Sequence, residues 1–160
     1  MDIYSVRVAD WHDQGEALRA VREAVFIREQ GVPVELEWDE FDAGCIHLMA
    51  MDAAENAIGT ARLLQQGENG GIGRIGRMAV LKEWRGKGVG DALMRRLLKE
   101  AAAREIQQLT LSAQVYAAGF YARFGFVAMG NRFMEAGIPH VKMALRLGVR
   151  PANPSNPSLS

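Results

Sequence analysis

The strongest constraint on the fold is a long helical pattern that begins directly after a glycine-rich run. Its apolar positions recur every four residues, at Val89, Leu93, Leu97 and Ala101. Apolar residues at this spacing form one stripe of a helix, and that stripe has to be buried against another element. The sequence therefore predicts an amphipathic helix over about 89–104 that packs on the rest of a layered domain.

Shorter patterns typical of strands lie on both sides of this helix. Strands are expected over residues 4–9, 46–51, 58–64, 72–81, 109–113, 126–129 and 140–147. We also expect a helix that begins at an N-cap, Asp13, and stops at Gly31 and Pro33, and a short helix at about 117–123. Helices that alternate with strands favour a layered α/β or α+β fold.

Length and composition bear on the organisation of the chain. Its 160 residues favour one domain, which we expect over residues 1–148. Residues 149–160 are rich in Pro, Asn and Ser. A segment of that composition buries too little apolar surface to fold, so a disordered tail is predicted there.

Charge and cysteine content exclude several classes of protein. Nineteen basic residues balance nineteen acidic ones, which gives no electrostatic case for a nucleic-acid or membrane-surface partner. The single cysteine, Cys45, rules out an intramolecular disulfide and favours a reducing cytoplasm. Three scattered histidines and one cysteine lack the spacing of a metal site, so no metal is expected.

Two glycine-rich runs compete as nucleotide-binding motifs. Residues 71–76 spell G-x-G-x-x-G, but they run into a predicted strand, whereas a dinucleotide-binding motif must open a helix. The second run is followed by the long helix and preceded by a strand; it consists of Arg85, Gly86, Lys87, Gly88, Val89 and Gly90. Its glycines allow backbone N–H groups to approach an anion, and the helix start adds partial positive charge. We therefore predict a pyrophosphate site there. The run lacks the Ser or Thr of a Walker motif.

At these residues the chain resembles the GCN5-related N-acetyltransferase (GNAT) superfamily. Residues 85–90 match its Q/R-x-x-G-x-G/A signature, and residues 120–126 resemble its late F-Y-x-x-x-G-F motif. Residues 22–30 and 133–140 resemble the ElaA/YjcF-type branch. The resemblance implies a mixed, mostly antiparallel sheet of six to seven strands flanked by helices. It also implies acetyl-coenzyme A as the donor substrate.

The resemblance further implies roles for individual residues. The strand before the signature would be splayed from its neighbour, and the backbone of Met78, Ala79 and Val80 would hold the pantetheine arm and the thioester. Tyr121 would be the acid that protonates the departing thiolate, with Tyr116 as a second candidate. Gln114 occupies a position where the family often has Asn, so its contact with the cofactor is a weaker expectation.

The acceptor site is expected in an acidic loop over residues 32–44. Glu35, Glu37 and Asp39 lie there beside aromatic side chains, which suits a cationic amine; a solvated acidic loop is the alternative. His47 on the next strand is a further candidate, although such histidines are more often structural. His140 has the same two interpretations, and Glu135 is a weaker acidic candidate.

Three functions remain in view from the sequence. The first is direct transfer of an acetyl group from acetyl-coenzyme A to a primary amine of a small molecule or peptide. The second is a non-catalytic sensor that binds acyl-coenzyme A, and the third is an acyl-homoserine-lactone synthase, which shares the fold. Related folds often pair, so a homodimer is also an expectation.

Overall fold

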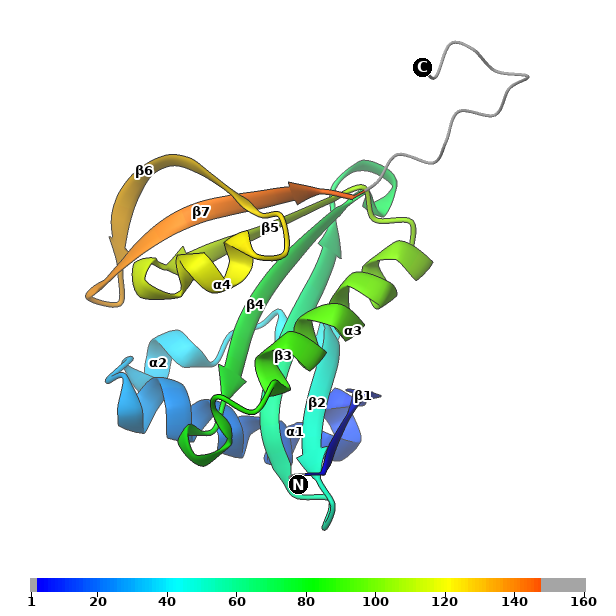
Figure 1. The fold of residues 1–160 in the computed structure, drawn as a ribbon, viewed down its shortest axis with the longest axis vertical. Helices are drawn as coiled ribbons and strands as arrows, with labels where there is room; N and C mark the ends of the chain where they lie inside the picture. The colour runs from blue at the N-terminus through cyan, green and yellow to red at the C-terminus, as the bar shows by residue number, and fades with distance from the viewer. Residues whose placement is uncertain (1–2, 148–160) are drawn as a thin grey trace.

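The computed structural model describes residues 3–147, and the predicted tail over 149–160 lies outside them. The described chain forms a seven-stranded sheet in the order β1-β2-β3-β4-β5-β7-β6 (Figure 1). Its strands are β1 Tyr4–Ala9, β2 Ile46–Asp52, β3 Ala57–Gln66, β4 Ile72–Val80, β5 Gln108–Gln114, β6 Val127–Glu135 and β7 Ile138–Arg146. β4 and β5 run parallel, and the other neighbouring strands run antiparallel. The expected mixed, mostly antiparallel sheet is confirmed.

Helices cover both faces of this sheet. The helical segments are α1 Trp11–Arg22, η1 Glu23–Glu29, α2 Val34–Glu37, η2 Asp42–Gly44, η3 Glu68–Gly70, η4 Lys82–Trp84, α3 Val89–Ala103, η5 Val115–Ala117 and α4 Ala118–Ala122. Figure 1 shows α3 and α4 in front of the sheet and α1 and α2 behind it. The sheet is therefore the middle layer of a three-layer arrangement.

Alternation along β2 explains how both faces are filled. Leu48 and Ala50 pack in the main core beneath α3, whose Leu93 is fully buried. The intervening Met49 packs with Leu18 of α1 on the opposite face. Because successive side chains of a strand point to opposite faces, one buried strand supplies both cores.

The start of the first helix and the length of β6 differ from the predictions. Asp10, not Asp13, is the N-cap of α1, and its carboxylate accepts a hydrogen bond of 2.8 Å from the backbone N–H of His12. Asp13 lies in the first turn, where an acidic side chain is also favourable. β6 continues to Glu135 instead of ending at residue 129. Because the strand is exposed throughout, its second half has no pattern of buried apolar residues by which the sequence could show it.

β4 departs from its parallel neighbour halfway along its length. The pairing of β4 with β5 covers Ile72 to Ile75 and ends there. Arg77 and Met78 then lie opposite the single residue Ala61 of β3, which makes a β-bulge. Arg77 has a left-handed φ of 51°. Because a bulge bends its strand, the second half of β4 turns away from β5, as the resemblance implied.

Candidate active site

Two cavities meet where β4 leaves β5. The first, of about 500 Å³, lies between the end of β4, residues 85–90 and α4, and we call it the loop cavity. The second, of about 400 Å³, lies between the segment around α2, the sheet and the β6–β7 turn, and we call it the sheet cavity. Both are lined by Gln30, Met78, Tyr116, Ala117 and Tyr121. Molecules bound in the two cavities would therefore meet at these residues.

The loop cavity contains the predicted pyrophosphate site. Gly88 has a left-handed φ of 85° and is the N-cap of α3, so the first N–H groups of that helix are available at the loop. A Cβ at Gly88 would lie 3.0 Å from the hydroxyl of Tyr4, and one at Gly90 would lie 3.4 Å from the ring of Phe120. The absence of side chains at these two glycines keeps the backbone of the loop accessible, and an accessible helix N-terminus can bind an anion such as a pyrophosphate.

Arg85 links this loop to the end of η1. Its two terminal nitrogens contact both carboxylate oxygens of Glu29, at 2.6 and 2.7 Å. Its Nε donates a hydrogen bond of 3.0 Å to the carbonyl of Val80. The hydrogen bond from Arg85 lowers the pKa of Glu29. Arg85 thus holds the loop against both η1 and the end of β4, and part of its charge is balanced by Glu29.

Tyr121 lies at the junction of the two cavities. Its ring packs edge-on against Phe120 and Phe126, with ring centroids 5.1 and 6.0 Å away. Burial raises the pKa of Tyr121 to about 12, so its hydroxyl stays protonated at neutral pH and can donate a hydrogen bond to a neighbouring acceptor. The second candidate, Tyr116, is 76% exposed, and its hydroxyl accepts a hydrogen bond of 3.2 Å from Gln30.

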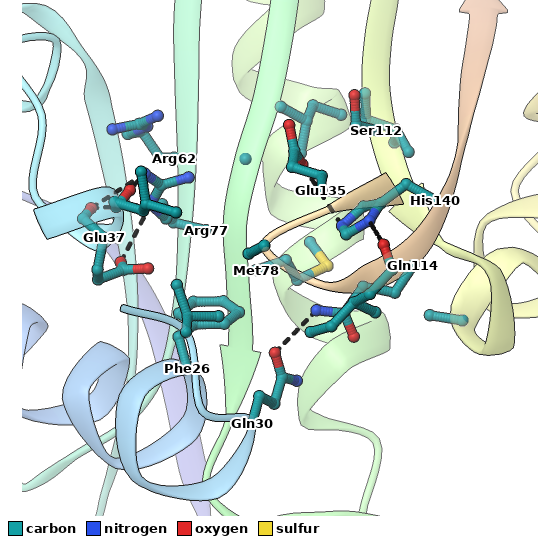
Figure 2. Close-up of a pocket in the computed structure, with 18 of the residues that line it drawn as sticks. Phe26, Gln30, Glu37, Arg62, Arg77, Met78, Ser112, Gln114, Glu135 and His140 are labelled. Carbon is teal, nitrogen blue, oxygen red and sulfur yellow. Dashed lines mark hydrogen bonds and ion pairs between the residues drawn. The ribbon is translucent and has the colours of Figure 1, made fainter. Parts of the chain in front are cut away.

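Gln114 reaches across the opening between the split strands. Its side-chain amide donates a hydrogen bond of 2.8 Å to the side-chain oxygen of Gln30, as the dashed line in Figure 2 shows. Gln30 follows η1 and is 84 residues away in sequence. Sequence reasoning missed Gln30, because nothing near it in the chain signals a contact with β5.

Two of the predicted acceptor-site carboxylates, Glu37 and Asp39, line the sheet cavity. Together with Asp42 they pair with three arginines contributed by α1, β3 and β4, namely Arg22, Arg62 and Arg77. We call these six residues the arginine–carboxylate cluster. The shortest contact joins Arg22 to Glu37 at 2.7 Å. Burial raises the pKa of Glu37 despite the opposing charges of Arg77 and Arg22. Three arginines balance three carboxylates, so the cluster offers a cationic amine little net attraction.

The other two predicted acceptor-site residues lie outside both cavities. Glu35 is exposed on α2. His47 is buried, stacks on Trp11 at 4.7 Å between ring centroids, and contacts the carbonyl of Asp42 at 2.7 Å through Nε2. Burial lowers the pKa of His47. Its contacts are those of a structural histidine, and neither residue is brought to the place where the cavities meet.

A histidine and a carboxylate lie together in the wall of the sheet cavity that faces the arginine–carboxylate cluster (Figure 2). His140 is buried, and its Nε2 lies 3.4 Å from a carboxylate oxygen of Glu135. The sequence alone gives His140 two interpretations, structural or functional, and makes Glu135 a weaker acidic candidate. They come from neighbouring strands joined by a tight turn, which explains their proximity.

Two further searches cover the same described part of the chain. Residues 3–147 contain no group of three or more His, Cys, Asp or Glu side chains arranged to hold a metal ion. Among the helices of that range, none has the length and apolar character needed to cross a membrane.

Comparison with known proteins agrees with this geometry. Residues 9–147 match the sequence model of the acetyltransferase (GNAT) domain. The uncharacterized N-acetyltransferase YjcF of Bacillus subtilis is 38% identical over 124 residues, which cover 77% of this chain and 86% of YjcF. An acyl-CoA N-acyltransferase from Pseudomonas aeruginosa superposes with a TM-score of 0.77 at 32% identity, over 90% of this chain and 99% of that one. Escherichia coli ElaA superposes with a TM-score of 0.77 at 28% identity, with the same coverage.

Proposed function

The chain belongs to the GNAT acetyltransferase family, and on that premise we propose that it transfers the acetyl group of acetyl-coenzyme A directly to a primary amine. The observation that carries the proposal is the meeting of two cavities at Tyr121, beside the split between β4 and β5. The loop cavity would take the donor substrate and the sheet cavity the acceptor. Direct transfer needs both molecules at one place at the same time, and this arrangement supplies that place.

The residues of the loop cavity fit the donor substrate. The backbone of residues 86–90 and the start of α3 would bind the pyrophosphate, with Arg85 and Lys87 adding positive charge. Beyond Ile75, β4 has no ladder to β5, so the edge of Met78–Val80 can hydrogen-bond the amides of a pantetheine arm. An N–H of the same segment would stabilise the oxyanion that develops on the thioester carbonyl.

Tyr121 would act as the acid of the reaction. A thiolate leaves more readily when a proton reaches sulfur as the carbon–sulfur bond breaks. The partly buried phenol holds that proton at neutral pH, because its pKa is raised to about 12. A sensor that only binds acyl-coenzyme A would need the loop cavity but not a second cavity that reaches the same tyrosine. The sheet cavity therefore favours catalysis over sensing.

Calorimetry with acetyl-coenzyme A tests the donor half of the proposal. Arg85→Glu reverses a charge at the loop and sets a second carboxylate beside Glu29, so we expect acetyl-coenzyme A to bind at least about tenfold more weakly, or about 1.4 kcal/mol. The matched control is Arg146→Glu, since Arg146 is exposed at the far end of β7 and lines neither cavity. Wild-type protein that fails to bind acetyl-coenzyme A would overturn the proposal.

A thiol-release screen tests the acceptor half. The balanced charges of the sheet cavity do not single out one amine class, so the screen should include polyamines, amino sugars, amino acids and peptides. Release of coenzyme A that depends on an added amine supports transfer, whereas binding without release by any amine refutes it. A homodimer and a cytoplasmic location also remain predictions, and sedimentation of the purified chain tests the first.

A further inference from the structure

Glu135 and His140 lie on either side of the β6–β7 turn, at the wall of the sheet cavity. Glu135 is the last residue of β6, and His140 is the third residue of β7. The two intervening turn residues, Ala136 and Gly137, both have left-handed backbones, with φ of 51° and 75°. Figure 2 shows the pair on the side of β4 opposite the arginine–carboxylate cluster. The pair therefore faces the cavity from the β6–β7 hairpin.

The contacts of His140 determine which of its nitrogens is basic. Nδ1 lies 2.7 Å from the carbonyl oxygen of Ile138, which can only accept a hydrogen bond. Nδ1 must therefore carry the hydrogen, and in the neutral ring Nε2 carries the lone pair. The ring also stacks on Phe133, with centroids 5.9 Å apart, which limits its rotation. The basic nitrogen thus has a fixed direction.

Nε2 of His140 points toward a second hydrogen-bond acceptor, the carboxylate of Glu135, and not toward a donor. A carboxylate oxygen of Glu135 lies 3.4 Å from Nε2, longer than the 2.7–2.9 Å or so of a charged N–H···O bond. Two acceptor atoms facing the same space leave room for a donor that bonds to both. The side chain of Glu135 is 55% exposed, so it can adjust to such a donor.

We propose that Glu135 and His140 bind the protonated acceptor amine and that Nε2 of His140 removes its proton. This inference rests on the proposed amine acetylation and names the base for it. An ammonium group has three N–H donors, so it can bond to the carboxylate and to Nε2 together. After proton transfer, the charged imidazole is stabilised by the carbonyl of Ile138 at Nδ1 and by Glu135 at Nε2.

The protons of the complete reaction then balance. The amine loses one proton to Nε2, and its lone pair forms the new bond to the acetyl carbon. The carbon–sulfur bond breaks, Tyr121 gives its proton to sulfur, and the phenolate takes the remaining extra proton from the new amide nitrogen. His140 finally releases its proton to water. His140 pairs with Gln114 across β7 and β5, at the end of β5 where the cavities meet.

Of the groups that line the sheet cavity, His140 is the one that is available to act as a base. Glu37 and Asp39 are engaged by arginines, so their lone pairs already accept charged hydrogen bonds. The ionisable groups that face His140 come from β6, β7, the opposite wall, η5 and α4: Glu135, Lys142, Glu37, Asp39, Arg62, Arg74, Arg77, Tyr116 and Tyr121. A pH profile has to separate His140 from these groups by mutation.

Two small probes test the proposal. Methylamine is almost wholly protonated at neutral pH and needs a base, whereas hydroxylamine is unprotonated and does not. We expect His140→Gln to lower kcat/KM for methylamine about 10²–10⁴-fold and to remove the acidic limb of its pH profile. For hydroxylamine we expect a loss below about tenfold, with unchanged acetyl-coenzyme A affinity. Glu135→Gln should mainly raise KM for methylamine. The matched control, His12→Gln, alters an exposed histidine on α1 and should change neither rate.

The outcomes separate this inference from the function on which it rests. Equal losses for the two probes, or an acidic limb that persists in His140→Gln, would show that His140 is only structural, and amine acetylation would stand. Wild-type protein that acetylates neither these probes nor any amine of the thiol-release screen would overturn amine acetylation at this site and the inference with it. If His140→Gln fails to fold, two other measurements decide. The first is the ratio of the methylamine rate to the hydroxylamine rate in Glu135→Gln, and the second is nitrogen NMR of His140 in the wild type. A hydrogen on Nε2 of the neutral ring would refute the assignment.

Discussion

Replacing Tyr121 by Phe removes one hydroxyl from the junction of the cavities and leaves the ring contacts in place. Burial raises the pKa of Tyr121 to about 12 from an ordinary value of 10, so the phenolate is disfavoured in the folded chain. At pH 8 about one tyrosine in 10⁴ is then ionised, and the proton is available for sulfur. We expect Tyr121→Phe to lower kcat about 10²–10⁴-fold. The affinity for acetyl-coenzyme A should hardly change, because the hydroxyl acts only as charge develops on sulfur.

Thiol-release kinetics and calorimetry measure these two quantities separately. Tyr116→Phe is the comparison variant, since Tyr116 lines the same junction but is exposed; a much larger loss of kcat in Tyr121→Phe than in Tyr116→Phe assigns the acid role to Tyr121. The same pKa shift predicts that the free energy of unfolding falls as pH rises from 10 to 12, because the unfolded chain loses the Tyr121 proton first. Tyr121→Phe should remove that part of the decline. A variant that keeps the wild-type kcat would refute the acid role.

Three further substitutions test the packing around the site. Arg22→Ala leaves Glu37 and Asp42 buried without their shared partner and should lower the free energy of unfolding by about 3–5 kcal/mol in urea denaturation; a change below 1 kcal/mol would show that the cluster contributes little. Leu97→Ala empties a fully buried position under α3 and should lower the same quantity by about 2.7–5 kcal/mol, with little effect on acetyl-coenzyme A affinity. Gly88→Ala forces a left-handed residue against Tyr4 and should lower stability by about 1–2 kcal/mol. It should also weaken acetyl-coenzyme A binding in calorimetry, and full retention of affinity would contradict the role of the loop.

Periodicity located the elements whose burial follows a regular pattern. The predicted helix over 89–104 and strand over 4–9 correspond to α3 and β1 almost residue for residue. Both have one face against the core, so apolar spacing along the chain directly reflects burial. The loop before α3 was found for a similar reason, since its glycines and the helix start are adjacent in sequence.

Contacts between distant segments could not be predicted in this way. From the sequence, the carboxylates near α2 are predicted to bind a cation. Their partners Arg62 and Arg77 lie on strands 20 or more residues away, so the local sequence does not show that these carboxylates are already paired. The bond between Gln30 and Gln114 likewise depends on how the strands separate. Local composition carries no information on such pairings, because they form only when the strands and helices pack together.

The bulge at Arg77 affects both faces of the sheet. Ile75, before it, packs under α3, whereas Ala79, after it, packs against Val21 and Val25 on the opposite face. In a regular strand, Ile75 and Ala79 would lie on the same face. Arg77 is therefore equivalent to one residue inserted into an otherwise regular strand. Its deletion would leave the remaining side chains on their present faces while removing the bend beside β5. The bulge therefore opens the sheet beside β5 while β4 still contributes side chains to both cores.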